Sequence, residues 1–434
     1  MKLVQSQFSE VIMSKRLLLL LLILTLCNAL ALAQAKPQTN PHPVMTLDAA
    51  RLARLDRVLQ EYVDKNQLAG IVALVMQDGR PVYERALGWA DKEAGRKMMT
   101  DTIFRIASQT KAITSAAILI LMEDGKLNLD DPVGKFIPTF RNTTVAVKKD
   151  SGIEIVPAKR AITIRDLLTH TAGISYGTSP EVAALYEAKG LGPAAGNGWY
   201  TADKDEPVGV TMERLGTLPF VAQPGEAYVY GYNTDILGAV VEKAAGMPLD
   251  QFIRERITQP LGMKDTQFFL PPTERNRLAT LYGSKDGQAV RAPDGAKGQG
   301  HYVDGPRKSF AGGAGLLSTA RDYARFLEMT RNGGTLDGVR LMSPRTVMLM
   351  RTNQAGTLHS QTGLGFGYGF QTTDRYGANG MDGVGAYGCG GAYGTNYRVD
   401  PEARLTLVLM IQQLPNSTDI ARKFPALVYQ ALVH

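Results

Sequence analysis

Ser108 and Lys111 lie three positions apart at the start of a long apolar segment. On a helix, residues at this spacing share one face, with Cβ atoms about 5–6 Å apart, so the lysine amine can reach the serine hydroxyl. The residues that follow are apolar nearly all round, as in a buried helix: "AITSAAILILM". Burial and the positive end of the helix dipole both favour a neutral lysine. A neutral amine activates the serine as a nucleophile, and free N–H groups of the first helical turn can hold an oxyanion.

An S-x-x-K spacing also arises by chance in long sequences, so two competing patterns matter. Ser175, in "GISYG", matches the G-x-S-x-G nucleophile elbow, which needs a strand before it and a helix after it. Here a helical segment, "IRDLLTH", precedes the motif and a Ser/Thr/Pro loop follows it. We therefore expect Ser175 on the surface or at a pocket rim, and His170 as a residue that caps or packs at the helix end. "GVGAYG" (383–388) leads into a strand, so it does not predict a phosphate-binding loop.

The elements that must position these residues are strands near both chain ends and helices between them. Residues 70–91 predict two strands joined at Asp78-Gly79. Residues 394–413 predict a strand, a turn at Asp400-Pro401 and a long apolar strand. Apolar spacing predicts helices at 47–66, 108–123, 163–170, 234–246, 249–258, 318–331 and 417–432. This order favours an α/β fold: a mixed, largely antiparallel sheet built from both chain ends, flanked by helices, with an inserted mostly helical domain.

The first residues of the chain have the pattern of a secretory signal. Lys15 and Arg16 precede the apolar run "LLLLLLILTLCNALALAQA", in which Ala31 and Ala33 form an A-x-A cleavage site. We expect a signal peptide over 1–33 and export to the periplasm or the medium; the alternative is a retained membrane anchor.

The predicted domains follow this organisation. A proline-rich linker covers 34–46, and the sheet domain combines 47–107 with 318–434. The helical domain covers 108–317, and the active site is expected at the interface of the two domains.

Composition excludes several classes of function. Removal of residues 1–33 takes away three basic residues and one acidic residue, so the formal charge falls from +7 to +5. Apart from Lys148-Lys149 there is no basic block, so we expect no nucleic-acid partner. The five histidines are scattered and Cys389 is the single cysteine left after cleavage, so neither a metal site nor an intrachain disulfide is expected. We expect no cofactor, a small-molecule ester or amide substrate and no membrane span after cleavage; the sequence does not indicate the oligomeric state.

Longer motifs connect Ser108 and Lys111 to a known family. The chain resembles serine hydrolases of the class C β-lactamase and penicillin-binding-protein fold, and within them the family VIII esterases. The resemblance covers most of the chain from about residue 47 and is carried by "FRIASQTKAITSAAILILMEDGKLNLDDPVGKFIP", "ITIRDLLTHTAGI", "PGEAYVYGYNTDILGAVVEKAAGMPLDQFIRERITQPLGMKDT", "GGAGLLSTARDYARF" and "GGAYGTNYRVDP". It implies a β-lactamase-like fold with Ser108 as the nucleophile and Lys111 as its partner.

The second motif of this family is a tyrosine. In "YGYNTDILG", the distance to Gly238 places Tyr230 at that position. A tyrosinate or shared-proton tyrosine beside Lys111 can take the serine proton and later deliver it to the leaving group. Tyr228 and Tyr232 are neighbours in an ambiguous register, and Tyr232 stands where β-lactamases often have an asparagine, so we expect it at the substrate.

The third motif, K-T-G, H-x-G or W-x-G in relatives, is Cys389-Gly390-Gly391 here. Glycine suits a strand edge that substrate approaches closely, and the N–H groups of Ser108 and Ala392 would form the oxyanion hole. A neutral thiol cannot pair with a substrate carboxylate as lysine would, so the usual anchor for β-lactam or D-Ala-D-Ala recognition is lost. The alternative, that Cys389 is itself a nucleophile, lacks a histidine nearby in the sequence.

The resemblance thus implies a serine hydrolase that acts on carboxylic esters, or related acyl compounds, through an acyl-serine intermediate. The N-terminal pattern adds the expectation that this hydrolase is exported. Two alternatives remain. One is β-lactamase or D-alanyl-D-alanine carboxypeptidase or transpeptidase activity, with the same chemistry. The other is a catalytically silent binding protein, against which the intact motifs argue.

Overall fold

The computed structural model describes residues 45–193, 204–293 and 301–434. The predicted signal peptide, and the linker apart from its last two residues, lie outside these ranges. Within them, no helix has the length and apolar character that a membrane span requires. Residues Leu47–Leu432 form one compact unit by their contacts. The division into a sheet domain and a helical domain stays a prediction.

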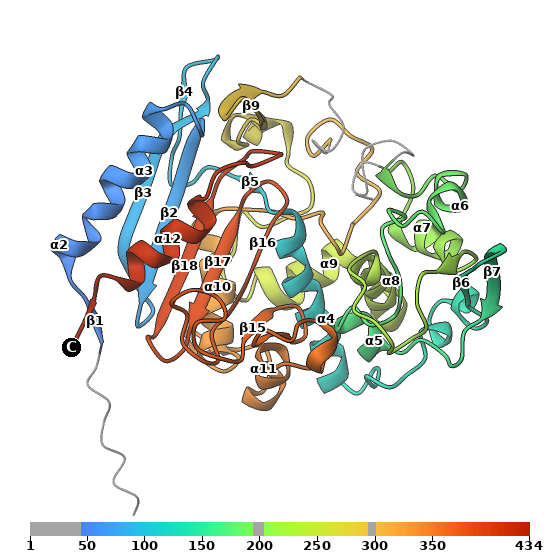
Figure 1. The fold of residues 1–434 in the computed structure, drawn as a ribbon. Coiled ribbons are helices and arrows are strands. Elements are labelled where there is room, and N and C mark those ends of the chain that lie inside the picture. Colours follow the sequence, from blue (N-terminus) through green and yellow to red (C-terminus); the bar gives the residue numbers. More distant parts are fainter. Residues whose placement is uncertain (1–44, 194–203, 294–300) are drawn as a thin grey trace, which may run out of the picture. The chain divides into compact units, whose positions relative to one another are not determined.

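An eight-stranded antiparallel sheet brings the two ends of the chain together, as the sequence predicted (Figure 1). The link between its halves is β18 against β2, with Leu407 opposite Val75. In spatial order the strands are β14 (Leu364–Phe366), β15 (Gln371–Thr373), β16 (Tyr387–Gly390), β17 (Asn396–Asp400), β18 (Leu405–Met410), β2 (Gly70–Gln77), β3 (Arg80–Asp91) and β4 (Arg96–Lys97).

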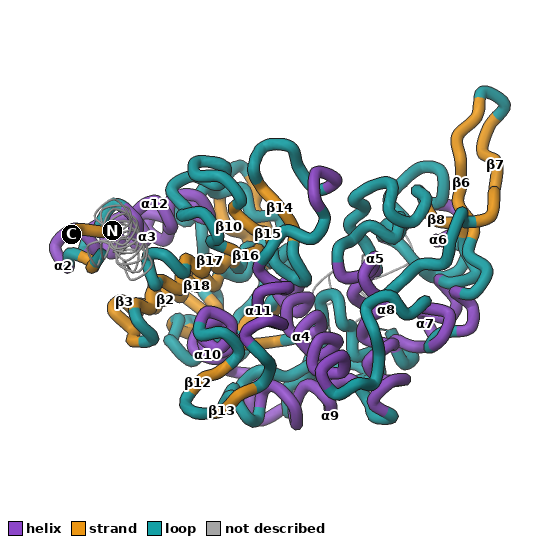
Figure 2. Tube along the Cα trace, turned by 90° about the horizontal axis from the view of Figure 1, so that it is seen from below, coloured by secondary structure: helices purple, strands orange, loops and turns teal. Residues whose placement is uncertain are grey.

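Helices cover both faces of this sheet, which explains why β2 and β18 read as continuous apolar runs. Figures 1 and 2 show α3 (Arg54–Asp64) and α12 (Ile420–Tyr429) on one face and α10 (Ala320–Arg331) on the other. The predicted helix at 47–66 is divided at Ala53 into α2 (Ala49–Leu52) and α3. The predicted helices at 318–331 and 417–432 correspond to α10 and α12.

The helix α4 (Thr110–Glu123) is almost entirely enclosed. Every residue from Thr110 to Leu121 is buried. It packs against α8 (Asn233–Ala245), and Figure 2 shows it between the sheet and the helices α5 (Ile164–Leu168), α7 (Val208–Leu215) and α8. The predicted helix at 249–258 begins as α9 (Leu249–Ile253) and continues as a π-helical turn, η5 (Arg254–Thr258).

Smaller elements complete the described part of the chain. The short helices are α6 (Ala183–Glu187), α11 (Pro344–Arg351) and the 3₁₀ turns η1 (Ala107–Gln109), η2 (Val133–Lys135), η3 (Pro138–Phe140), η6 (Pro272–Arg277) and η7 (Gly356–Leu358). The short strands are β1 (Thr46–Leu47), β5 (Phe104–Arg105), β6 (Thr144–Lys149), β7 (Gly152–Pro157), β8 (Pro219–Phe220), β9 (Tyr282–Lys285), β10 (Gln288–Arg291), β11 (Leu317–Ser318), β12 (Thr335–Leu336), β13 (Val339–Arg340) and β19 (Leu432–Val433).

Candidate active site

Ser108 lies in the 3₁₀ turn η1, directly before α4. From residue 102 to residue 121 it is the one position that is not buried. Its neighbour Ala107 has a φ of 43°, in the left-handed region that non-glycine residues rarely adopt. Such strain concentrates at functional sites, where the surrounding packing maintains it. Here the turn leaves the serine accessible while the helix behind it is enclosed.

Lys111 is enclosed beside Ser108 and is only 3% exposed. Its Nζ lies 3.3 Å from Ser108 Oγ, 3.0 Å from the Tyr176 hydroxyl and 2.7 Å from the Gly313 carbonyl oxygen. Burial disfavours the ammonium form and lowers the pKa of Lys111 to about 8, although the nearby Asp235 carboxylate opposes the shift. The fraction of neutral amine at neutral pH is therefore far larger than for an exposed lysine.

Tyr230, which precedes α8, comes to the same serine from a separate part of the chain. Its hydroxyl shares a hydrogen bond with the Ser108 side chain. Lys111 Nζ lies 4.7 Å from the centre of the Tyr230 ring. Desolvation, reinforced by Cys389, raises the pKa of Tyr230 above its ordinary value of 10.0. Of the two forms expected, a tyrosinate and a shared-proton tyrosine, this environment favours the second.

Tyr176 is a site residue that the sequence interpretation missed. It lies within "GISYG", the segment whose serine resembled a nucleophile, and its hydroxyl accepts the shortest side-chain hydrogen bond from Lys111. The Tyr176 ring packs edge-on against those of Tyr230 and Tyr232, with centroids 5.9 and 4.9 Å apart. No spacing rule in the sequence connects Tyr176 to Lys111, because the loop between them is placed by tertiary packing alone.

Ser175, in the same segment, is not on the surface or at a pocket rim as expected. Ser175 is 3% exposed, so it is neither on the surface nor at a rim. Its Oγ accepts the Gly177 N–H at 3.1 Å, which is a turn-forming contact. His170 packs at the end of α5, as expected: its Nδ1 lies 3.0 Å from the Asn233 amide nitrogen, and its ring lies 4.6 Å from the Tyr230 ring.

The third motif reaches the site at the end of β16. A Cβ added to Gly391 would lie 2.4 Å from the carbonyl oxygen of Ile106, so only glycine fits where this strand meets the turn that carries Ser108. The Gly391 N–H bonds to Thr395, whereas the Ala392 N–H has no partner among the described residues. An unpaired donor next to the nucleophile's turn is what an oxyanion hole needs.

Cys389 is partly buried in β16, where it pairs with Tyr397 across the sheet. Burial raises the pKa of its thiol, although Lys111 and Arg398 oppose the shift. The side chain is therefore neutral at pH 7. Gly390 ends the strand opposite Asn396.

Asp235 supports Lys111 through the peptide of Gly313. The Asp235 side chain, on α8, accepts the Gly313 N–H at 3.1 Å, and the Gly313 carbonyl in turn accepts the Lys111 hydrogen bond. Asp235 is 3% exposed. It therefore orients the peptide that binds the amine and also contributes a negative charge nearby. Among the described residues, no group of three or more His, Cys, Asp or Glu side chains could hold a metal ion.

Comparison with known proteins decides which family these motifs represent. The family model described as Beta-lactamase matches residues 55–431. The chain belongs to the Beta-lactamase family. Esterase EstB of Burkholderia gladioli is 36% identical over 383 residues, with 84% of this chain and 91% of the relative covered. Protein Rv1367c of Mycobacterium tuberculosis is 38% identical over 389 residues, with 84% and 90% covered.

Among solved structures, the Beta-lactamase-family chain is similar to EstCE1, described as a hydrolase with promiscuous acyltransferase activity. The TM-score is 0.72 at 28% identity, and the match covers 88% of this chain and 98% of the other. The α/β, β-lactamase-like fold expected from the sequence is thereby confirmed. Together these likenesses identify a serine hydrolase of the esterase type.

Tyr232, two residues after Tyr230, is the residue that was expected at the substrate. It is 1% exposed, and its hydroxyl accepts the Gly192 N–H at 2.9 Å. Its ring supports that of Tyr176. Tyr232 thus packs against Tyr176, which contacts Lys111. Direct contact of Tyr232 with substrate stays a prediction.

Proposed function

We propose that the chain is an exported carboxylic-ester hydrolase that works through an acyl-serine intermediate at Ser108. The observation that carries the proposal is the contact between a desolvated lysine and an accessible serine. Lys111 Nζ lies 3.3 Å from Ser108 Oγ, and the pKa of Lys111 is lowered to about 8. An amine that is partly neutral at working pH can accept the proton that serine must lose on attack.

In the proposed acylation step, Ser108 Oγ attacks the ester carbonyl carbon while its proton passes to the Lys111–Tyr230 pair. The carbonyl oxygen becomes an oxyanion that the N–H groups of Ser108 and Ala392 stabilise. Collapse of this intermediate breaks the bond to the alcohol oxygen, which takes a proton from Tyr230. Water then attacks the acyl-serine by the same route, giving the carboxylic acid and free serine.

Three features support an ester over a β-lactam or a D-alanyl peptide. Cys389 is neutral and stands where family members that bind a substrate carboxylate use lysine. The relative EstB is named an esterase. EstCE1 is described as a hydrolase with promiscuous acyltransferase activity. β-Lactamase or D-alanyl-D-alanine peptidase activity would be favoured if the purified protein hydrolysed a cephalosporin with a kcat/KM far above that for p-nitrophenyl butyrate.

The decisive experiment compares Ser108→Ala with Ser175→Ala, using p-nitrophenyl butyrate. Loss of the nucleophile is expected to lower kcat by at least about 10³-fold. Ser175→Ala removes a buried turn contact that does not involve Ser108 or Lys111 and should keep kcat within about fivefold, because one neutral hydrogen bond contributes about 1 kcal/mol. If Ser175→Ala abolished turnover and Ser108→Ala did not, Ser175 would be the nucleophile instead of Ser108.

A fluorophosphonate probe separates an enzyme from a silent binding protein. It should label the native chain at Ser108, as peptide mass spectrometry can locate, and should leave Ser108→Ala unlabelled. A native chain that neither reacts with the probe nor hydrolyses esters would support the binding-protein alternative.

Export is proposed on the N-terminal sequence pattern, with cleavage after Ala33. Expression of the full chain in a Gram-negative host is expected to yield a processed protein in the periplasm or medium that begins at Gln34. Intact-mass measurement would detect this. A full-length product that stays with the membrane fraction would support the anchor alternative.

A further inference from the structure

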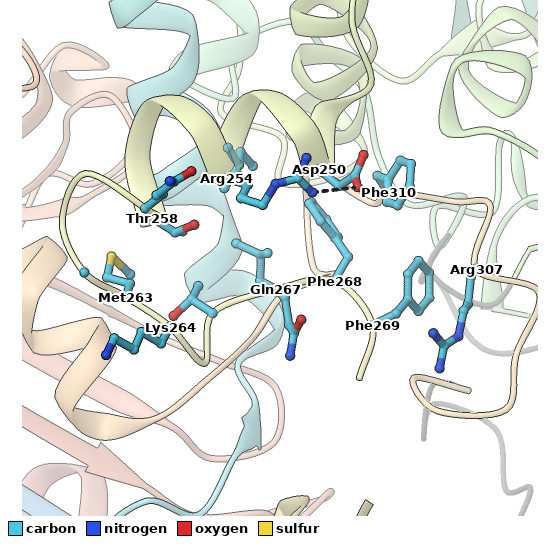
Figure 3. Close-up of a pocket in the computed structure, with 15 residues that line it drawn as sticks. Asp250, Arg254, Thr258, Met263, Lys264, Gln267, Phe268, Phe269, Arg307 and Phe310 are labelled. Carbon is cyan, nitrogen blue, oxygen red and sulfur yellow. Dashed lines mark ion pairs between the residues drawn. The ribbon is translucent and has the colours of Figure 1, made fainter. Parts of the chain in front are cut away.

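A cavity outside the catalytic site lies beside α9 and the π-helical turn η5 (Figure 3). Its volume is about 610 Å³, within the range of small-molecule sites. Ser108, Lys111 and Tyr230 do not line it. Its apolar wall is formed by Ile253, Met263, Phe268, Phe269, Phe310 and Leu316. We call it the Phe310 cavity.

Aromatic rings form much of the apolar wall. Phe310 makes an edge-to-face contact with Phe268, with centroids 5.4 Å apart, and a tilted contact with Phe269 at 5.9 Å. Figure 3 shows the three rings grouped on the side of the cavity near Arg307. Phe269 and Phe310 are only partly buried. A ligand with an apolar body would remove this remaining aromatic surface from water, which is favourable in proportion to the area covered.

The charged groups at the cavity are mainly cationic. Arg254, Lys264 and Arg307 line it together with one carboxylate, Asp250. Arg254 lies within ion-pair distance of two carboxylates: its Nη1 is 3.9 Å from Asp250 Oδ2 and its Nη2 is 3.9 Å from Glu255 Oε1. Both distances are too long for a hydrogen bond. Within the described ranges, no carboxylate lies within ion-pair distance of Lys264, which is exposed, and Arg307 donates to the main-chain carbonyls of Leu270 and Val303.

The backbone beside the Phe310 cavity contains a π-helical turn. The Gln259 N–H bonds to the Arg254 carbonyl at 2.9 Å, an i to i+5 contact that makes η5 a π-helical turn. Single π-helical turns within helices occur frequently at functional sites. This one places Arg254 and Thr258 on the wall of the Phe310 cavity. The guanidinium donors, the lysine and the aromatic wall therefore converge on one space.

We propose that the Phe310 cavity is a binding site for an amphiphilic organic anion, that is, a carboxylate or phosphate head group with an aliphatic or aryl body. The apolar body packs against Phe268, Phe269 and Phe310. The head group pairs with Arg254 and Lys264, whose donors form no other side-chain hydrogen bonds within the described residues. Both head groups match the guanidinium fork of arginine.

The test is isothermal titration of the purified full chain with octanoate, octyl phosphate, 1-octanol and octylamine. Octanoate or octyl phosphate should bind at least about tenfold more tightly than the alcohol and the amine. The relative strength of the two anions identifies the head group. Arg254→Gln combined with Lys264→Gln should weaken anion binding by at least about fivefold, since it removes both cationic partners of the head group.

Two further variants locate the site. Lys126→Gln removes an exposed lysine that does not line the cavity and should bind like the native chain. Gln267→Trp, on the wall, should fill the space and weaken binding of the anions without altering charge. The proposal is overturned if the anions bind no better than octanol, or if the double variant and Gln267→Trp bind octanoate as the native chain does. The second result would place the anion outside the Phe310 cavity, and it leaves the proposed ester hydrolysis unaffected.

Discussion

The amine of Lys111 lies closer to the Tyr176 hydroxyl, at 3.0 Å, than to the Ser108 hydroxyl, at 3.3 Å. Two tyrosines therefore contact the Ser–Lys pair, and they do so differently. Tyr230 shares a hydrogen bond with Ser108, whereas Tyr176 bonds to Lys111. Under the proposed mechanism, proton transfer at the serine falls to Tyr230 and orientation of the amine falls to Tyr176.

Replacement of each tyrosine by phenylalanine separates these roles. Tyr230→Phe removes a proton-transfer group and should lower kcat for p-nitrophenyl butyrate by about 10²–10³-fold. Tyr176→Phe leaves that group in place and should lower kcat by about tenfold, since it removes one hydrogen bond to a charged group. Tyr228→Phe is the control, because the Tyr228 ring contacts His170 and Phe366 rather than Lys111. A larger loss in Tyr228→Phe than in Tyr230→Phe would reverse the choice of register.

The pH dependence of turnover should report the ionisation of Lys111. Below its pKa of about 8 the amine is protonated and cannot accept the serine proton. The value of kcat/KM should therefore rise about tenfold per pH unit up to about pH 8 and then level off. The pKa values of His170 and His359 are lowered below 6.5, and the pKa of Cys389 is raised above 9.0. None of these three groups therefore explains a rise of kcat/KM that levels off near pH 8. Initial rates from pH 6 to 10, corrected for spontaneous hydrolysis, would measure the limb; a profile flat across pH 7–9 would contradict it.

Asp235 should set the position of that limb. Its carboxylate raises the pKa of Lys111, opposing the effect of burial. Asp235→Asn removes the charge but can still accept the Gly313 N–H, so the limb should move to lower pH while the plateau of kcat/KM falls less than about tenfold. Asp322→Asn, at another buried carboxylate that bonds to Thr266, should leave the limb unchanged. A loss of activity in Asp235→Asn without movement of the limb would indicate a purely structural role.

Cys389 should be dispensable for ester hydrolysis. Its raised pKa keeps the thiol protonated and weakly nucleophilic at neutral pH. Cys389→Ala is therefore expected to keep kcat within about threefold, and iodoacetamide should alkylate the native thiol slowly at pH 7. Complete loss of turnover in Cys389→Ala, with unchanged thermal stability, would instead support a chemical role for the sulfur.

Local sequence rules were sufficient where the geometry is local. The contact between Ser108 and Lys111 follows from helical spacing, and the strands of residues 70–91 follow from a hairpin signal around Asp78-Gly79. The tyrosine position came from the family resemblance, and the structure brings Tyr230 to Ser108. The break of the first helix at Ala53 was not predicted, because the apolar stripe continues across it.

The sequence by itself therefore determined the pairing of Ser108 with Lys111, the buried helix that begins beside them and the fold class. Only the tertiary structure decided that Tyr176 and Gly313 complete the environment of Lys111, and that Ser175 is enclosed in a turn. These residues lie in connecting segments with no periodic pattern, far from position 111 in the chain. Their contacts depend on how α4 and α8 pack and on where the loops between elements are held, and no short-range rule of spacing encodes either.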